Sequence, residues 1–291
     1  MIDLLVRAVI KCRFGVSTHL FHSQRLSRDH LLEIAAHGFE VIEVFATRTH
    51  FDYHNPAAVA DLQQWLAEAG LELYSIHAPI GESFIGGRWS GMLSIASRDG
   101  EARGRAVEEA KQALTIARRI PAKVLVAHVG CARGLQVAGD GDSRSAAKRS
   151  VEEIQESARP LDVRIALEVI PNVLSRAGSL VHFVEEDLDG ADVGICLDLG
   201  HAHLDGDLVE AMELVSEHLL AVDVHDNRGR ADDHLVPLEG TIDWPAAMTT
   251  MQKVGYEGAL MFELTGRGSP REALGRAKKA RVKLEHLLGD R

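Results

Sequence analysis

VRIALEVIPNVLSRAGSLVHFVEEDLDGADVGICLDLGH (residues 163–201) is the stretch that decides the fold of this chain. It opens with an apolar run at Val163–Val169, continues with helical spacing at Leu180–Asp187, and returns to an apolar run at Val193–Leu199. Two short apolar runs separated by a helical segment are typical of parallel strands joined by a crossover helix. The stretch therefore predicts one βα unit followed by the next strand.

The same alternation extends over the rest of the chain. Strand-like runs lie at Arg13–Ser17, Glu40–Phe45, Leu71–His77, Lys123–Val129, Val163–Val169, Val193–Leu199, Leu220–His225 and Ala259–Leu264. Helical spacing lies at Ser27–His37, Pro56–Ala69, Glu101–Arg119, Ser143–Ala158, Leu180–Asp187, Asp207–His218, Trp244–Lys253 and Pro270–Leu288. Helix starts carry candidate caps at Ser27, Asn55 and Asp243.

Eight βα units without a second domain favour a closed barrel over an open doubly wound sheet. No Gly-x-Gly-x-x-Gly pattern opens the first helix, which weakens the dinucleotide-binding alternative. We expect an α/β fold, a single (β/α)8 TIM barrel over residues 1–291, with residues 1–12 as an N-terminal extension.

The composition of the chain limits which partners it can bind and indicates the compartment in which it works. A net charge of −11 gives no general basic surface for nucleic acid, and no apolar run reaches transmembrane length. The N-terminal residues lack a signal-peptide cleavage pattern, and three widely spaced cysteines fit a reducing compartment. We therefore expect a cytoplasmic protein that binds a small molecule and neither a membrane nor nucleic acid.

Acidic and histidine residues stand at the ends of the four late strand-like runs: Glu168, Asp198, His225 and Glu263. A carboxylate in an apolar run is costly unless it is paired, and a divalent cation is one partner that all four could share. Strand ends of a barrel meet at the active face. The pattern predicts a site for Mn, Co, Zn or Mg, while ion pairing or core hydrogen bonding is the alternative for each residue alone.

Other residues are expected to face the same opening. His77 and His128 end the third and fourth runs, and His19 and Glu43 lie near the ends of the first two, where a rim or capping role is the alternative. An apolar wall against a sugar ring is expected from aromatic residues in two loops, with simple loop packing as the alternative: Phe21, His22, Phe84 and Trp89.

The chain resembles the xylose isomerase-like TIM barrel superfamily, which includes sugar and sugar-phosphate isomerases and epimerases, inosose dehydratases and endonuclease IV. The resemblance rests on the order of SIHAP (Ser75–Pro79), AHVG (Ala127–Gly130), ALEV (Ala166–Val169), CLDLGHAH (Cys196–His203), VHDN (Val224–Asn227), DDHLVPLEGTIDW (Asp232–Trp244) and FEL (Phe262–Leu264).

The epimerase branch of this superfamily implies one divalent ion, bound by the four strand-end residues. Glu168 and Glu263 would also act as the acid and base on the two faces of the substrate carbon, with proton transfer next to a carbonyl through an enediolate. His201 would point towards the substrate oxygens. The expected substrate-binding residues are His19, Glu43, Trp89 and Arg228. A homo-oligomer is also expected from the resemblance.

Endonuclease IV is the main alternative, as a zinc-dependent phosphodiesterase. Its pattern implies further metal or substrate positions at His77, His128, His201, Asp232 and His234. The segment IGESFIGGRWSGMLSIAS after SIHAP lacks the tyrosine and asparagine-rich insertion expected of a nuclease, and the loop arginines are scattered. An inosose-type dehydratase and a sugar-binding barrel without turnover are the remaining alternatives. The sequence favours the isomerase or epimerase.

Overall fold

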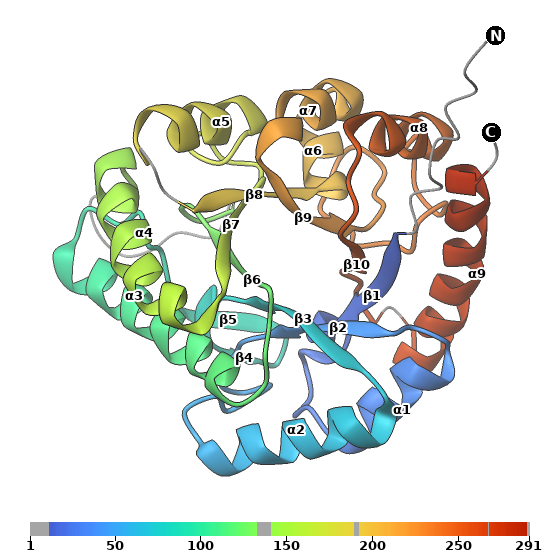
Figure 1. Cartoon of the computed structure of the whole chain (residues 1–291), viewed down its shortest axis with the longest axis horizontal. Coiled ribbons are helices and arrows are strands. Elements are labelled where there is room, and N and C mark those ends of the chain that lie inside the picture. Colours follow the sequence, from blue (N-terminus) through green and yellow to red (C-terminus); the bar gives the residue numbers. More distant parts are fainter. Residues whose placement is uncertain (1–11, 133–140, 189–191, 267, 290–291) are drawn as a thin grey trace, which may run out of the picture.

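The computed structural model describes residues 12–132, 141–188, 192–266 and 268–289. Its centre is a closed barrel of parallel strands in the order β1-β10-β9-β8-β7-β6-β3-β2, surrounded by helices (Figure 1). The barrel strands are β1 (Arg13–Ser17), β2 (Val41–Phe45), β3 (Glu72–His77), β6 (Val124–His128), β7 (Arg164–Glu168), β8 (Val193–Asp198), β9 (Leu219–Val224) and β10 (Ala259–Phe262). The predicted (β/α)8 barrel is confirmed.

Nine α-helices cover the barrel in the part of the chain that the structure describes. They are α1 (Arg28–Ala36), α2 (Pro56–Ala69), α3 (Gly100–Leu114), α4 (Arg144–Ala158), α5 (Ala177–Glu186), α6 (Leu199–Asp205), α7 (Leu208–Leu214), α8 (Trp244–Val254) and α9 (Pro270–Gly289). None of these described helices is long and apolar enough to cross a membrane. The extension expected at residues 1–12 lies outside the described residues, apart from Cys12.

Alternate residues of a barrel strand belong to two separate cores. In β8, Ile195 and Leu197 pack in the large core that includes the helices, whereas Cys196 packs with Val126 and Ala166 in a smaller cluster. Because side chains alternate along a strand, the smaller cluster fills the barrel interior. Asp198, two residues beyond Cys196, is therefore directed inwards as well.

Three expected helix caps are present. Ser27 and His30 form a capping box at the start of α1. Asn55 accepts a hydrogen bond from the Ala57 amide at 3.0 Å. Asp243 accepts one from the Ala246 amide at 3.0 Å. Such side-chain acceptors satisfy amides that have no partner within the helix.

Two elements were not predicted. Residues 81–92, which include Phe84 and Trp89 and were expected to lie in a loop, form a hairpin of β4 (Gly81–Ile85) and β5 (Arg88–Met92). Gly86 and Gly87 both have positive φ angles, of 60° and 77°, which suits the tight turn between the two strands. Helix α6 follows β8 directly, because the Asp198 carboxylate accepts a hydrogen bond from the His201 amide at 2.7 Å and caps the helix.

Candidate metal centre

Three groups of potential metal ligands lie at the carboxyl ends of the strands. Within each group of described residues, one ligand atom per residue lies within 4.8 Å of the others. The groups are His77, His128 and Glu168; Glu168, Asp198 and His201; and His201, His225, Asp232 and His234. Since the first two groups share Glu168 and the last two share His201, they form one continuous cluster.

Glu168, the last residue of β7, connects the first two groups. Its Oε2 lies 3.0 Å from His77 Nε2 and 2.9 Å from His128 Nε2, and its Oε1 lies 3.2 Å from His201 Nδ1. Burial alone would raise the pKa of Glu168, but the three histidines outweigh this effect and hold the pKa well below its usual range. The Oε1 atom is buried without a hydrogen-bond partner.

Asp198 and His225 form the most deeply buried pair of the cluster. His225 Nε2 lies 2.9 Å from Asp198 Oδ1, yet the contact lacks hydrogen-bond geometry and His225 Nε2 has no partner. Asp198 Oδ2 is also buried without a partner. The His225 ring packs against Gly200 of α6, where an added Cβ would lie 2.0 Å from His225 Cε1.

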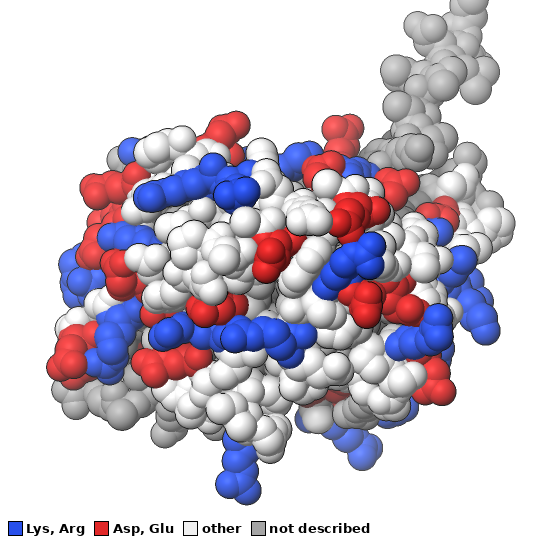
Figure 2. All heavy atoms as spheres, turned by 90° about the horizontal axis from the view of Figure 1, so that it is seen from below, with Lys and Arg blue, Asp and Glu red and all other residues white. Residues whose placement is uncertain are grey.

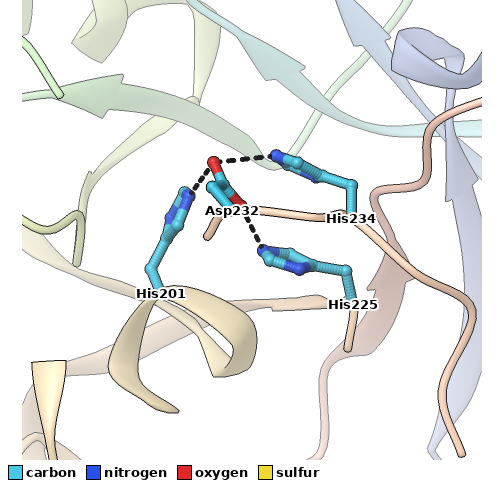
Figure 3. Close-up of side chains that lie close together, drawn as sticks. All are labelled: His201, His225, Asp232 and His234. Carbon is cyan, nitrogen blue, oxygen red and sulfur yellow. Dashed lines mark hydrogen bonds and ion pairs between the residues drawn. The ribbon is translucent and has the colours of Figure 1, made fainter. Parts of the chain in front are cut away.

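Asp232 lies among three histidines, as Figure 3 shows. Its Oδ2 is 3.1 Å from His201 Nε2 and 3.2 Å from His234 Nε2, and its Oδ1 is 3.6 Å from His225 Nε2. Burial raises the pKa of Asp232, but His234 and His201 lower it below its usual range by a larger amount. The Asp232 side chain is 39% exposed and that of His225 is 0% exposed, so the cluster meets solvent at Asp232.

The backbone fixes the tautomers of three histidines. The Nδ1 atoms of His77, His234 and His225 lie 2.8, 3.0 and 3.4 Å from carbonyl oxygens. A carbonyl only accepts, so each Nδ1 carries a proton, and the Nε2 of a neutral ring presents a lone pair to a carboxylate. Two facing acceptors require a proton or a cation between them. Histidine oriented by a backbone carbonyl is the usual arrangement in metal sites.

Protonation is the alternative way to satisfy these contacts. Burial lowers the pKa of His77, but Glu168 and other carboxylates raise it to about 9. Burial likewise lowers the pKa of His234, and Asp232 raises it to about 10. The cluster nevertheless contains carboxylate oxygens and imidazole nitrogens that are buried without a hydrogen-bond partner. Oxygen and nitrogen ligands of this kind fit a divalent cation.

Glu263, one residue beyond β10, belongs to none of the three groups found among the described residues. Its Oε2 lies 3.7 Å from His234 Nδ1. Burial, together with the charges of Glu168 and Asp198, raises the pKa of Glu263 to about 8 against the opposing effect of His234. Its carboxyl group thus interacts with the charges of the cluster from the β10 side.

The expected substrate-binding residues lie in different environments. Glu43 is buried, accepts a hydrogen bond from Ser75 Oγ at 2.9 Å through Oε2, and has no partner at Oε1. His19 is also buried, with Nδ1 3.1 Å from the Leu264 carbonyl oxygen. Arg228 is exposed in the loop after β9. Of these residues, His19 lies against the cluster, with the ring centroids of His19 and His234 5.0 Å apart.

Aromatic rings continue from His19 to the β4–β5 hairpin. His22 stacks on His19 at 4.4 Å between ring centroids and lies 4.3 Å from Phe84. Trp89 lies 4.9 Å from Phe84. The structure thus brings together three of the four residues expected to form an apolar wall: His22, Phe84 and Trp89. Phe21 was expected there too, but it stacks at 4.2 Å on His30 of α1, because the 3-10 turn after β1 directs it to the helix layer.

Comparisons with known proteins agree with this architecture. The model of the xylose isomerase-like TIM barrel family matches residues 31–287. An uncharacterized protein of Methanocaldococcus jannaschii is 28% identical over 269 residues, 90% of this chain and 87% of its own. The D-psicose 3-epimerase of Enterocloster bolteae is 22% identical over 239 residues, 79% of this chain and 74% of its own.

Solved structures show the same fold. A D-tagatose 3-epimerase-like protein superposes with a TM-score of 0.77 at 26% identity, covering 95% of this chain and 97% of its own. The IOLI protein, whose structure holds a zinc atom, gives a TM-score of 0.73 at 18% identity, covering 94% and 98%. With its closed barrel and a family match over most of its length, the chain belongs to the xylose isomerase-like TIM barrel family.

Proposed function

We propose that this protein is a divalent-metal-dependent isomerase or epimerase that moves a proton next to the carbonyl of a sugar or sugar phosphate. The observation that carries the proposal is the set of buried ligand atoms without partners, Glu168 Oε1, Asp198 Oδ2 and His225 Nε2. The relatives named as D-tagatose 3-epimerase-like and D-psicose 3-epimerase support sugar as the substrate class. We place the activity in the cytoplasm, in a homo-oligomer.

Glu168, Asp198, His225 and Glu263 would bind the ion, and their mixed oxygen and nitrogen ligands suit Mn, Co, Zn or Mg. When bound, the ion polarises a carbonyl and its neighbouring hydroxyl and so makes the adjacent C–H more acidic. Glu43 and Arg228 would contact more distant substrate oxygens.

Proton transfer would fall to the two glutamates. Glu168 stands at the end of β7 and Glu263 just beyond β10, with β8 and β9 between them, so the two carboxylates approach a bound molecule from different directions. The Glu168 Oε1 lone pair has no competing hydrogen bond and could take a proton. His201, between Glu168 and Asp232, would hold a proton at a substrate oxygen.

The ring wall supports a small substrate. His22, Phe84 and Trp89 would cover the apolar face of a sugar ring and exclude water from the transferred proton. Figure 2 shows one side of the barrel, turned by 90° from the end-on view of Figure 1, and on this side Lys and Arg are interspersed with Asp and Glu instead of forming a continuous basic tract. Duplex DNA binding depends on many phosphate contacts made by cationic side chains.

A zinc-dependent phosphodiesterase of the endonuclease IV kind stays the second candidate. The observation in its favour is the pair of extra groups, in which His77 and His128 contact Glu168 while His201 and His234 contact Asp232. Several zinc ions in such groups would activate water and neutralise phosphate. This candidate requires more than one ion per chain.

Elemental analysis of protein purified without added metal or chelator tests both candidates. About one ion per chain is expected for the isomerase, whereas two or three zinc ions would favour the phosphodiesterase. Glu263→Gln then tests the chemistry, since it retains the shape of the side chain but removes the base. We expect loss of C–H exchange into deuterated water with a smaller loss of sugar binding. Unchanged exchange would refute the role of Glu263.

A further inference from the structure

Asp226 follows His225 directly and organises the segment that comes after β9. Its carboxylate is buried, and both oxygens are used. The donors to Oδ1 are the amides of Asn227 at 2.9 Å and Ile242 at 3.2 Å, and the donors to Oδ2 are the amides of Leu238 at 3.0 Å and Gly240 at 3.0 Å and the Trp244 indole Nε1 at 2.9 Å. A buried carboxylate that accepts five N–H groups is fully satisfied without any counter-charge.

The same segment has a strained backbone. His234 and Leu238 are non-glycine residues with positive φ angles of 43° and 76°. Such conformations persist only where the surrounding contacts determine them strongly. The amide of Leu238 is one of the Asp226 donors, and paired backbone hydrogen bonds of 2.8 Å join Asp226 to Leu235. Contacts with Asp226 therefore hold both ends of the strained stretch.

The turn at Gly240 packs closely against Asp226. A Cβ on Gly240 would lie 2.2 Å from Asp226 Oδ1 and 2.2 Å from the Asn227 carbonyl oxygen. The turn at Gly240 can therefore reach the carboxylate only because that residue is glycine. Trp244, which closes the other side, is 1% exposed and starts α8.

Two members of the candidate metal cluster, Asp232 and His234, belong to this segment (Figure 3). The hydrogen bonds of the Asp226 carboxylate go to neither of them. We infer that Asp226 is a positioning residue, which sets the metal affinity of the cluster by holding residues 227–243 in the conformation that directs Asp232 and His234 at His201 and His225. The inference rests on the proposed function only in requiring that the cluster binds a divalent cation.

Both side-chain oxygens of Asp226 are needed as acceptors, because all five donors are N–H groups. In Asp226→Asn one oxygen becomes an NH2 group, which donates and cannot accept. With either orientation of the amide, two or three of the five N–H donors lose their acceptor. Trp244→Phe removes a single donor and leaves the carboxylate in place. Asp243→Asn is the matched control, since Asp243 is exposed, belongs to the same segment and caps α8 through Ala246.

Two measurements on the full-length protein test this role. Co²⁺ titration of metal-free protein, followed by visible absorption, gives the metal affinity and reports on ligand geometry. Hydrogen–deuterium exchange of peptides covering residues 235–242 reports on the amides that Asp226 holds. For Asp226→Asn we expect 10–100-fold weaker Co²⁺ binding, the usual effect of losing a residue that supports metal ligands, and at least about tenfold faster exchange in this segment.

Trp244→Phe should give smaller changes of the same sign, and Asp243→Asn should match the wild type in both measurements. The inference is overturned if Asp226→Asn binds Co²⁺ with wild-type affinity, or if its affinity falls while exchange of residues 235–242 is unchanged. Should Asp226→Asn not fold, wild-type values for Trp244→Phe in both measurements would overturn it. Absence of Co²⁺ binding by the wild type would refute the proposed function, and unchanged exchange in the variants would separately refute the role of Asp226.

Discussion

Gly200→Ala is expected to displace His225 from the candidate metal cluster without changing any of the candidate ligands. Gly200 is the second residue of α6, and its Cα packs against the His225 ring. An added Cβ would lie 2.0 Å from Cε1, 2.3 Å from Nδ1 and 2.5 Å from Nε2 of that ring. The ring is 0% exposed, and an added Cβ at these distances requires it to shift from its position beside Asp198.

The expected magnitudes follow from overpacking and from linkage. Overpacking of this kind costs about 1–3 kcal/mol, partly offset by the better helix propensity of alanine, up to about 1 kcal/mol. Metal at a hundred times its dissociation constant stabilises the wild type by about 2.7 kcal/mol. If the affinity of the variant falls a hundredfold, the same concentration stabilises it by only about 0.4 kcal/mol.

Thermal unfolding with and without Co²⁺ measures both effects. At roughly 2 °C per kcal/mol for a chain of this size, the metal-induced rise in Tm should fall from roughly 5 °C to less than about 1 °C. Gly104→Ala is the control, because Gly104 is exposed in α3 and an added Cβ meets nothing within 4 Å. It should stabilise slightly and retain the full metal-induced rise. A full rise in Gly200→Ala would refute the placement of His225 as a ligand.

Three further predictions concern other parts of the molecule. Burial lowers the pKa of His50 from 6.5 to about 4. As pH falls, the unfolded chain therefore binds a proton at this residue before the folded chain does. The free energy of unfolding should fall by about 3 kcal/mol between pH 6.5 and pH 4. His50→Asn, which can keep the hydrogen bond to the Gln24 carbonyl oxygen, should abolish that part of the acid sensitivity in urea titrations, and an unchanged pH dependence would contradict it. Gly240→Ala should lower the free energy of unfolding by about 1–3 kcal/mol, since the added Cβ would clash with the Asn227 carbonyl oxygen. A loss under about 0.5 kcal/mol, the usual range of a neutral substitution, would show that the turn can relax. If the proposed sugar isomerase activity holds, Trp89→Ala should raise KM roughly 2–10-fold with kcat nearly unchanged, whereas an equal fall in kcat would assign Trp89 to the transition state.

Residues at strand ends were predictable because strand position and side-chain direction follow from a local pattern. Glu168 and Asp198 are the last residues of β7 and β8, and His225 and Glu263 follow β9 and β10 by one residue. In a parallel barrel all these ends meet at one face, so the order of strands suffices to bring them together. The roles assigned to these residues stay predictions.

The remaining features depend on contacts that a local pattern does not contain. Asp226 receives hydrogen bonds from amides and an indole up to Trp244, and nothing in VHDN indicates that its carboxylate is already used. Helix α6 did have a signal, an aspartate three residues before His201, but the apolar run at Val193–Leu199 favoured continuation of the strand. The hairpin likewise had a turn signal in the sequence, Gly86–Gly87. Two adjacent glycines are found both in flexible loops and in tight hairpin turns, so this signal alone did not predict the two strands.

The two sides of the barrel differ in a way that would orient a substrate. Strands β7 to β10 and the segment after β9 contribute the carboxylates of the cluster, whereas β1, β2 and the hairpin contribute rings, with Phe45 of β2 lying 4.7 Å from His77 and 6.2 Å from Trp89. Glu43 is the one buried carboxylate that β2 adds among these rings. His19 links the two sides, because it is held by the Leu264 carbonyl next to Glu263 and stacks on His22. A molecule with a polar edge and an apolar face would bind here in one orientation, with its oxygens on the carboxylate side. Since both glutamates lie on that side, stereochemical control of proton transfer would depend on the rings as much as on the acids.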